Sequence, residues 1–510
     1  MTNASAPPHA TTARPGEALP HVPTGHARWP LGLHVLVTGA LACLTVPRMA
    51  QVGMFVDGVN YAAVARNLAS GMGSVWRPFY TETVYPVFHE QPPLGLALQA
   101  VSFRLLGDAL WVERAYSLAM IVATATLIVL LWRRTIGARG FAWLPLLFWL
   151  LPGVVTWAAV NNMLENTQVV FTMLAVYTFL RGSEPRGAPW WGVAAGASVV
   201  TAALVKGPVG LFPLAAPFLL WFSAPRARGA RALVSGAVMW ATAGAGSVLV
   251  VSLGAWPALV AYLESSLVPA VAGSRQSGKR VSQFVRHLFT GTLARMAALL
   301  VVLVIAGRGT RVRERTWNGA VPPGTAPAAA SPRAWTAFFF LIGLAGSIPV
   351  LFSGRVAGHY FVAATPLYAM AFAGLALPFV AGLQDPAPGP TRARLVAGGL
   401  GVILLAAAVV VPVVAGPLEK RDVAWVRAFD ALADAVPRGA TLGTCPSLRE
   451  NWGLHAYMQR LFRVSLDAVH PGRHEYFWQM TAACDLPPTC RPVKTAPPFS
   501  LARCQPVPMR

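Results

Sequence analysis

The chain has 510 residues, of which 55% are hydrophobic and only 12% are charged. Average soluble domains carry about a quarter charged residues, so this composition excludes the three or four soluble domains that the length would suggest at about 150 residues each. Long apolar stretches recur almost to the end of the chain, which also excludes an intrinsically disordered protein. We therefore predict an all-α polytopic membrane protein.

The formal net charge is +22, from 41 Lys and Arg against 19 Asp and Glu. The basic residues come in small clusters between the apolar stretches, not in one run. Such clusters are typical of membrane orientation and of contact with anionic lipids. We expect membrane lipids as partners and no nucleic acid.

In chain order, residues 1–30 are rich in Pro, Ala, Thr and His without periodicity, which predicts a disordered cytoplasmic tail. The first apolar segment lacks an evident small-residue cleavage site, so we expect an uncleaved helix. About eleven segments approach the 17–25 residues that a bilayer requires, with the divisions near Pro152 and Pro208 left open. They are 31–46, 109–132, 141–158, 160–180, 190–206, 207–223, 232–256, 289–306, 335–353, 358–383 and 395–416.

Arginine positions predict the orientation of these helices. With the N-terminus in the cytoplasm, every inner connection carries arginine, as the positive-inside rule requires. The connecting arginines are Arg133, Arg134, Arg139, Arg181, Arg186, Arg226, Arg228, Arg231, Arg308, Arg311, Arg313, Arg315, Arg392 and Arg394. An odd number of helices then places residues 417–510 outside the cytoplasm.

Four of the five cysteines, Cys445, Cys484, Cys490 and Cys504, lie in this exported tail. An oxidising compartment favours two disulfides, for which three pairings exist, and the C-x2-C pairs typical of zinc sites are absent. Sequence proximity predicts that Cys484 pairs with Cys490 and Cys445 with Cys504. An apolar run at 440–444, a helical stretch at 448–462 and a second run at 463–469 predict a small extracytoplasmic α/β domain.

Two outer segments are long enough to hold a site. The segment 48–108 contains Asp57-Gly-Val-Asn-Tyr61 and His89-Glu90-Gln91-Pro92-Pro93-Leu94. The segment 257–288 carries Arg275, Lys279, Arg280 and Arg286. Basic residues outside contradict the orientation rule, so they either bind a lipid phosphate or belong to a merely solvated loop.

Asp57 follows the first span at the water interface, where it is either a functional carboxylate or the N-cap of the helix that follows. Glu90 precedes two prolines that would fix its backbone, although a plain loop acid has the same sequence. Glu165 lies within an apolar span, on one helical face with Asn161 and Gln168. Such a polar stripe is either an intramembrane site or a contact between helices.

Two further clusters fall at outer helix ends. Lys206 precedes Gly207-Pro208 and is either a functional cation or a lysine that snorkels to the interface. Arg355 and His359 lie one turn apart beside Tyr360, and aromatic-belt anchoring would explain Tyr360 alone. Counting the helices from a cytoplasmic N-terminus places all these groups on the same outer side of the membrane. This common side favours a single site over scattered structural residues.

This arrangement resembles the GT-C membrane glycosyltransferases, specifically the protein O-mannosyltransferases and the lipid A aminoarabinose transferases. The matching residues cover about 48–366 and follow the family's order. They are Asp57 to Tyr61, Glu90-Gln91-Pro92-Pro93-Leu94, the Asn161–Asn166 stretch with Glu165, Lys206-Gly207-Pro208, and His359-Tyr360 followed by Pro366.

The resemblance implies inverting transfer of a sugar from a polyprenyl-phosphate donor to a lipid, glycan or protein acceptor, on the periplasmic face of a bacterial inner membrane. Asp57 is then the expected catalytic base, with Glu90 as the alternative. The family often has Lys where this chain has Gln91, so donor phosphate binding would fall to Lys206, Arg355 or the basic outer segment. Tyr61, Glu165, His359 and Tyr360 complete the expected substrate-binding set.

The chemistry needs a base for the acceptor hydroxyl and cations for the departing phosphate. The donor lipid is already activated, so no nucleotide cofactor is expected, and a requirement for a divalent cation is left open. Two other functions remain as alternatives. One is a lipid or sugar transporter or flippase without catalysis, although no internal repeat of the transporter type is evident. The other is a polymer ligase that uses a lipid-diphosphate donor.

Overall fold

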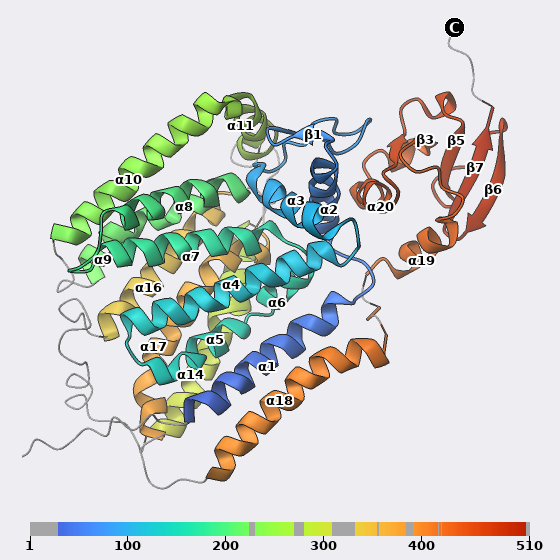
Figure 1. Cartoon of the computed structure of the whole chain (residues 1–510). Coiled ribbons are helices and arrows are strands. Elements are labelled where there is room, and N and C mark those ends of the chain that lie inside the picture. The colour runs from blue at the N-terminus through green and yellow to red at the C-terminus, as the bar shows by residue number, and fades with distance from the viewer. Residues whose placement is uncertain are drawn as a thin grey trace, which may run out of the picture.

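The computed structural model describes residues 29–223, 230–269, 280–308, 332–353, 356–383, 391–416, 418–419 and 421–505. The predicted cytoplasmic tail lies almost wholly outside these residues. The apolar segments form helices that stack side by side in one bundle, with a separate sheet-containing region at one end (Figure 1). The predicted all-α membrane protein with a small C-terminal α/β region is therefore confirmed.

The first part of the bundle contains helices from both sides of the long outer segment. They are α1 (Trp29–Met49), α4 (Val112–Thr135), α5 (Trp143–Leu150), α6 (Gly153–Val160), α7 (Leu164–Gly182) and α8 (Trp190–Lys206). The second part begins with η2 (Pro208–Ala215), α9 (Ala216–Ser223) and α10 (Ala230–Val250), which continues through η4 (Val251–Ala255), α11 (Trp256–Tyr262) and η5 (Leu263–Leu267). It ends with α13 (Arg280–Val285), η6 (Arg286–Leu293), α14 (Ala294–Gly307), α16 (Pro332–Ser347), η7 (Ile348–Phe352), η8 (Gly358–Ala364), α17 (Thr365–Leu383) and α18 (Thr391–Val414).

The predicted eleven spans are not confirmed as eleven. Among the described residues, seven helical stretches are long and apolar enough to cross a membrane, or eight if a bent pair counts as one span. That pair is α5–α6, which bends by 79° at its break. Pro152 stands at the break and cannot donate a backbone hydrogen bond, which explains the bend. The segments from α8 to α9 are shorter than a full span, because the chain turns at Gly207 before Pro208.

Helices α1 and α18 pack along each other at the edge of the bundle (Figure 1). Their backbones come close where Gly39 meets Gly401, since a Cβ on Gly39 would lie 2.4 Å from the Gly401 carbonyl oxygen. Small residues allow such close approach between membrane helices. The remaining helices surround a core of large side chains that includes Trp132, Phe148 and Phe338.

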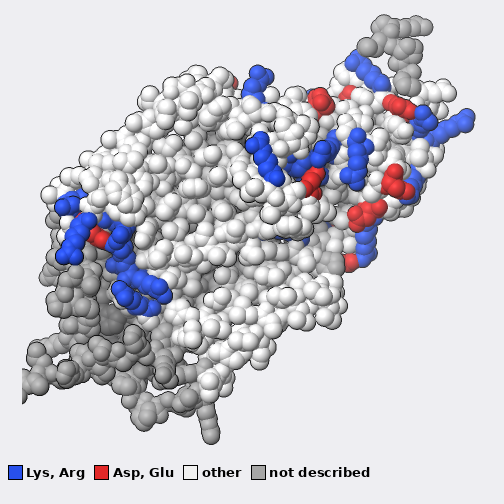
Figure 2. Space-filling view, in the orientation of Figure 1, with Lys and Arg blue, Asp and Glu red and all other residues white. Residues whose placement is uncertain are grey.

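Charged side chains are distributed along the bundle in a way that fits a membrane. On the face shown in Figure 2, Lys and Arg gather at one end of the helices and again around the outer segment and the C-terminal region. A broad band without charge separates the two groups. Arg134 and Arg181 at the first end both pair with Glu184. The protein is therefore a multi-pass membrane protein, with the polar ends of its helices at two interfaces.

The long outer segment forms two helices and a short hairpin at one end of the bundle. Helix α2 (Val56–Ala69) packs against α3 (Leu94–Leu106), and β1 (Gly73–Ser74) pairs with β2 (Arg77–Pro78) between them. The C-terminal region contains α19 (Val423–Leu432) and α20 (Trp452–Phe462), and α20 lies against α2 (Figure 1).

The C-terminal sheet has the order β4–β3–β5–β7–β6. Its strands are β3 (Thr441–Thr444), β4 (Ser465–Asp467), β5 (Tyr476–Met480), β6 (Cys490–Ala496) and β7 (Phe499–Cys504). Strand β3 is parallel to β4 and β5, whereas β7 is antiparallel to β5 and β6. Helix α20 makes the crossover from β3 to β4, and Phe429, Trp478 and Phe499 form an aromatic core beside the sheet.

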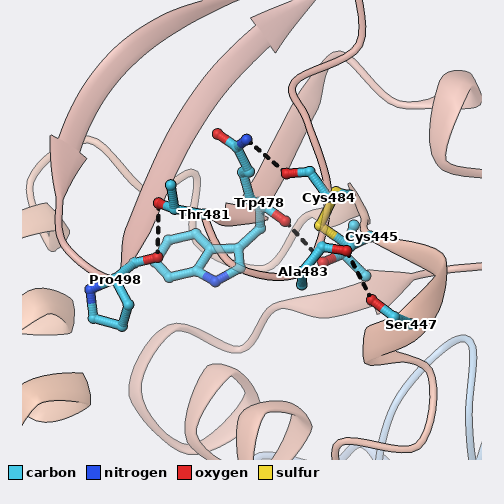
Figure 3. The surroundings of a disulfide bond; sticks show 9 residues. Cys445, Ser447, Trp478, Thr481, Ala483, Cys484 and Pro498 are labelled. Carbon is cyan, nitrogen blue, oxygen red and sulfur yellow. Dashed lines mark hydrogen bonds between the residues drawn. A yellow bond between two sulfur atoms is a disulfide. The ribbon is translucent and has the colours of Figure 1, made fainter.

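Two disulfides form among the four tail cysteines, as expected, but the predicted pairing is wrong. Cys445 bonds to Cys484 (Figure 3), and Cys490 bonds to Cys504. Sequence proximity failed because strand register decides the partners: Cys490 and Cys504 are directly opposite each other in the β6–β7 pair. Cys445 follows β3 and meets the turn after β5, where Ser447 also donates a hydrogen bond to the Ala483 carbonyl at 3.2 Å.

Candidate active site

Asp57 lies in the first turn of α2, at the end of the bundle that adjoins the C-terminal region. The N-cap of this helix is Phe55, and the helix has no side-chain cap hydrogen bond. The sequence left open whether Asp57 is an N-cap, and its position in the structure does not support that role. A carboxylate in a first turn still gains from the helix dipole.

Glu165 and Lys206 form a buried ion pair beneath α2. The Lys206 Nζ lies 2.9 Å from Glu165 Oε1, and the two side chains are only 10% and 2% exposed. The same ammonium donates a weaker hydrogen bond to the Tyr61 hydroxyl at 3.4 Å and lies 5.5 Å from the centre of the Tyr61 ring. Since Lys206 ends α8 and Glu165 begins α7, this pair joins two bundle helices to α2. A lysine that snorkels to the interface would not have these partners.

His359 joins the same cluster from η8. Its Nε2 lies 3.8 Å from Glu165 Oε1, and its ring stacks on Trp157 with centroids 5.6 Å apart. Tyr360 packs edge-on against the His359 ring. A cavity of about 400 Å³ opens beside His359 and is lined also by Trp157, His287 and Arg295.

The electrostatics of the cluster centre on Asp57 and Tyr61. Burial raises the pKa of Asp57 above its ordinary value of 3.8, although Lys206, His359 and Arg421 each act to lower it. Burial raises the pKa of Tyr61 well above 10.0, and the carboxylates of Asp57, Glu165 and Glu90 add to that shift. A carboxylate with a raised pKa is a better proton acceptor than an ordinary aspartate, provided that it is ionised.

Glu90 lies at the edge of this cluster. The Tyr85 hydroxyl donates a hydrogen bond to Glu90 Oε1 at 3.4 Å, and the Ser266 hydroxyl donates to the Glu90 carbonyl oxygen at 3.3 Å. These contacts hold the loop before α3 against η5. Glu90 is therefore a fixed carboxylate within electrostatic range of Tyr61, and not a freely solvated loop acid.

The predicted polar stripe of Asn161, Glu165 and Gln168 separates into different roles. Asn161 ends α6 and therefore lies outside the helix of the other two; its side-chain oxygen accepts a hydrogen bond from the Phe55 amide at 2.8 Å. Gln168 donates to the Ala202 carbonyl on α8 at 3.3 Å. These two amides connect helices, whereas Glu165 belongs to the ion pair.

Several predicted basic residues do not enter the described cluster. Arg275, Lys279 and Arg355 lie outside the described residues. Arg280 begins α13 and makes no ion pair with another described residue. Within the described parts of the chain, no group of three or more His, Cys, Asp or Glu side chains is arranged to hold a metal ion.

Sequence reasoning missed Arg421, which precedes α19. Its guanidinium lies 5.0 Å from the centre of the Phe55 ring, and its charge acts on Asp57. The backbones are also in close contact there, because a Cβ on Gly53 would lie 2.1 Å from the Arg421 carbonyl oxygen. No sequence signal could have identified this residue, since the contact depends on how the C-terminal region packs on the bundle.

Comparisons with known proteins agree with this architecture. Residues 90–274 match the sequence model of the family described as dolichyl-phosphate-mannose-protein mannosyltransferase. A search of curated protein sequences gave no match.

Two solved structures of ArnT from Cupriavidus metallidurans are similar over nearly the whole chain. The apo form superposes with a TM-score of 0.60 at 17% identity, covering 92% of this chain and 96% of ArnT. The form bound to undecaprenyl phosphate gives 0.58 at 16% identity, covering 92% and 97%. At this identity the similarity establishes the fold. The resemblance indicated by the sequence motifs is confirmed, and this chain is a membrane protein with the GT-C glycosyltransferase fold.

Proposed function

We propose that this protein is a membrane glycosyltransferase that moves a sugar from a polyprenyl-phosphate donor to a hydroxyl group of a lipid, glycan or protein acceptor. The observation that carries the proposal is the cluster at the start of α2. There Asp57 and Tyr61 lie one turn apart on α2, and the Lys206 ammonium, paired with Glu165 at 2.9 Å, donates to the Tyr61 hydroxyl at 3.4 Å. Transfer from a lipid phosphate requires a base for the acceptor hydroxyl and a cation for the departing phosphate, and this cluster contains both.

In the proposed reaction the acceptor oxygen attacks the anomeric carbon from the face opposite the phosphate. The bond from that carbon to the phosphate oxygen breaks, and polyprenyl phosphate leaves with the electron pair. The hydroxyl proton passes to Asp57. Because the attack comes from the face opposite the departing phosphate, the configuration at the anomeric carbon inverts. Lys206 stabilises the charge on the departing phosphate. Arg275, Lys279, Arg280 and Arg355 remain proposed further ligands of that phosphate.

Glu165 has a different task in this proposal from the one expected for a direct substrate ligand. Its carboxylate is almost fully buried and holds the Lys206 ammonium at 2.9 Å. A buried ammonium without a counter-charge is costly, so Glu165 keeps Lys206 charged and in place. His359 and Tyr360 line the adjoining space, and Glu90 is the alternative base.

The membrane side is part of the same proposal. We propose a bacterial inner-membrane protein with its N-terminus in the cytoplasm and its reaction on the periplasmic face. The arginines of the predicted inner connections support this orientation. The two disulfides of the C-terminal region support it as well, because disulfides persist in oxidising compartments.

A donor assay on the purified protein tests the function directly. Radiolabelled polyprenyl monophosphate sugars and polyprenyl diphosphate sugars are offered separately, and free carrier lipid is measured. Release of polyprenyl phosphate from a monophosphate donor is the expected result. Release from diphosphate donors alone would identify a ligase instead. Movement of a labelled lipid across vesicle membranes, without cleavage of any donor, would identify a transporter.

A further inference from the structure

Helix α20 of the C-terminal region packs on α2, the helix that carries Asp57. At the far end of α2, Arg66 donates a hydrogen bond to the Gln459 carbonyl oxygen at 2.6 Å. Asn67 donates to the Gln459 side chain at 3.4 Å. Arg66 is only 2% exposed, so the C-terminal region buries the last turn of α2.

Buried charges strengthen the same contact. Arg460 of α20 forms hydrogen-bonded ion pairs with Glu113 at 3.0 Å and with Asp108 at 2.8 Å, both in the segment that begins α4. Asp108 also pairs with Arg66 at 3.2 Å. Arg460 and Glu113 are each 4% exposed at the side chain. Separating the C-terminal region would break both ion pairs of Arg460 and leave only the Arg66–Asp108 pair, and loss of a buried ion-pair partner is strongly unfavourable.

Tyr457, also on α20, reaches the other end of α2. Its hydroxyl oxygen accepts a hydrogen bond from the Met54 amide at 3.0 Å, just before the helix begins. The same hydroxyl has two acceptors for its single hydrogen, Asp422 Oδ2 at 3.1 Å and the Met54 carbonyl oxygen at 3.3 Å from the hydroxyl oxygen. On the bundle side, Asn161 accepts from the neighbouring Phe55 amide. The backbone amides of Met54 and Phe55 are thus held by one side chain from the C-terminal region and one from the bundle. Just before them, Arg114 of α4 donates to the Gln51 and Gly53 carbonyl oxygens at 2.8 and 2.9 Å.

We propose that Tyr457 is a positioning residue for Asp57, so that the C-terminal region is a working part of the site. This inference rests on the proposed function of Asp57. Tyr457 does not touch the reacting atoms in this scheme. It fixes the backbone three residues before the base, and displacement of a catalytic group by about 1 Å is enough to cost on the order of 100-fold in rate.

The test is Tyr457→Phe in the full-length protein. The substitution removes the hydroxyl but keeps the ring, which packs on Phe429 with centroids 5.7 Å apart, so the fold is retained. Tyr476→Phe is the matched control, because Tyr476 lies on β5 of the same region and its hydroxyl has no hydrogen bond to another described residue. Two quantities are measured for each variant. They are hydrogen exchange of the peptide covering residues 54–61, and kcat and KM for release of polyprenyl phosphate from the donor.

Tyr457→Phe should exchange about fivefold faster in residues 54–61, as expected for one lost hydrogen bond, while peptides of α7 are unchanged. The kcat should fall about 10-fold or more, with the donor KM within about twofold, since the donor-binding cation on α8 is not disturbed. Tyr476→Phe should match the wild type in both.

Wild-type exchange or wild-type kcat for Tyr457→Phe overturns the inference. A rise in donor KM with unchanged kcat overturns it as well. Asp57→Asn, assayed in parallel, separates this failure from failure of the proposed function. If Asp57→Asn keeps more than about a tenth of wild-type turnover, the base assignment fails. If it falls below that while Tyr457→Phe has normal kcat, only the positioning role fails.

Discussion

Replacing Asp57 by Asn tests the proposed base with little change in shape. The structural cost is small, because Asp57 is not the N-cap of α2 and caps no backbone amide there. The variant loses the interaction of a carboxylate with the helix dipole, which is typically worth about 0.3–1 kcal/mol.

A second contribution to stability has the opposite sign. Burial raises the pKa of Asp57, so the folded protein binds the proton more tightly than the unfolded chain. The resulting stabilisation is complete when the pH is below 3.8, the ordinary pKa of Asp in the unfolded chain. It is lost as the pH rises through the higher pKa of the folded protein. At neutral pH the buried carboxylate therefore opposes folding, and Asn removes that penalty. The net change in melting temperature should stay within roughly 4 °C.

The expected loss of activity is much larger. General-base catalysis contributes about 10²–10⁴-fold, which is about 3–5 kcal/mol of transition-state free energy at 1.36 kcal/mol per factor of ten. Turnover should therefore fall at least about 100-fold in a protein of nearly unchanged stability. Wild-type turnover should also decline as pH falls through the raised pKa of Asp57, and the residual activity of the Asp57→Asn variant should lack this decline.

The assay compares release of polyprenyl phosphate by wild type, Asp57→Asn and Asp430→Asn at equal amounts of folded protein. Asp430 is an exposed acid on α19 and serves as the control for loss of one carboxylate. Asp57→Asn with more than about a tenth of wild-type turnover would refute the assignment of the base and would move it to Glu90.

Three further predictions concern the ion pair, the disulfides and the topology. Lys206→Ala should reduce both donor affinity and turnover, and it should destabilise the protein by about 3–5 kcal/mol because Glu165 loses its buried partner. The double variant Lys206→Met/Glu165→Gln should recover thermal stability but not activity. Normal donor binding by either variant would make Lys206 only a structural lysine. Peptide mapping without reductant should recover Cys445–Cys484 and Cys490–Cys504, whose sequence separations of 39 and 14 residues correspond to about 4 and 3 kcal/mol in the chain-entropy model; four free thiols would contradict this. Reporter fusions at Ala424 and Gly229 should report opposite sides of the membrane, and the same side for both would remove the proposed orientation.

Local sequence properties were sufficient for much of this protein. Hydropathy and length located the apolar segments that form the bundle helices, although not their number as spans and not the apolar helix α3, because burial of a helix in lipid depends on its own residues. Pro152 marked the bend between α5 and α6 for an equally local reason. Helix parity placed Asp57, Glu165, Lys206 and His359 at the same end, and the structure brings them into one cluster.

Contacts between distant segments required the tertiary structure. Cysteine partners depend on strand register in the C-terminal sheet, so proximity along the chain misled the pairing. The buried pair of Glu165 with Lys206 depends on how α7 packs against α8. Arg421 and Tyr457 meet the start of α2 only because α20 and the segment before α19 fold back onto it. Periodicity and hydropathy describe each helix by itself, whereas the surroundings of Asp57 are set by packing between segments that the sequence keeps far apart.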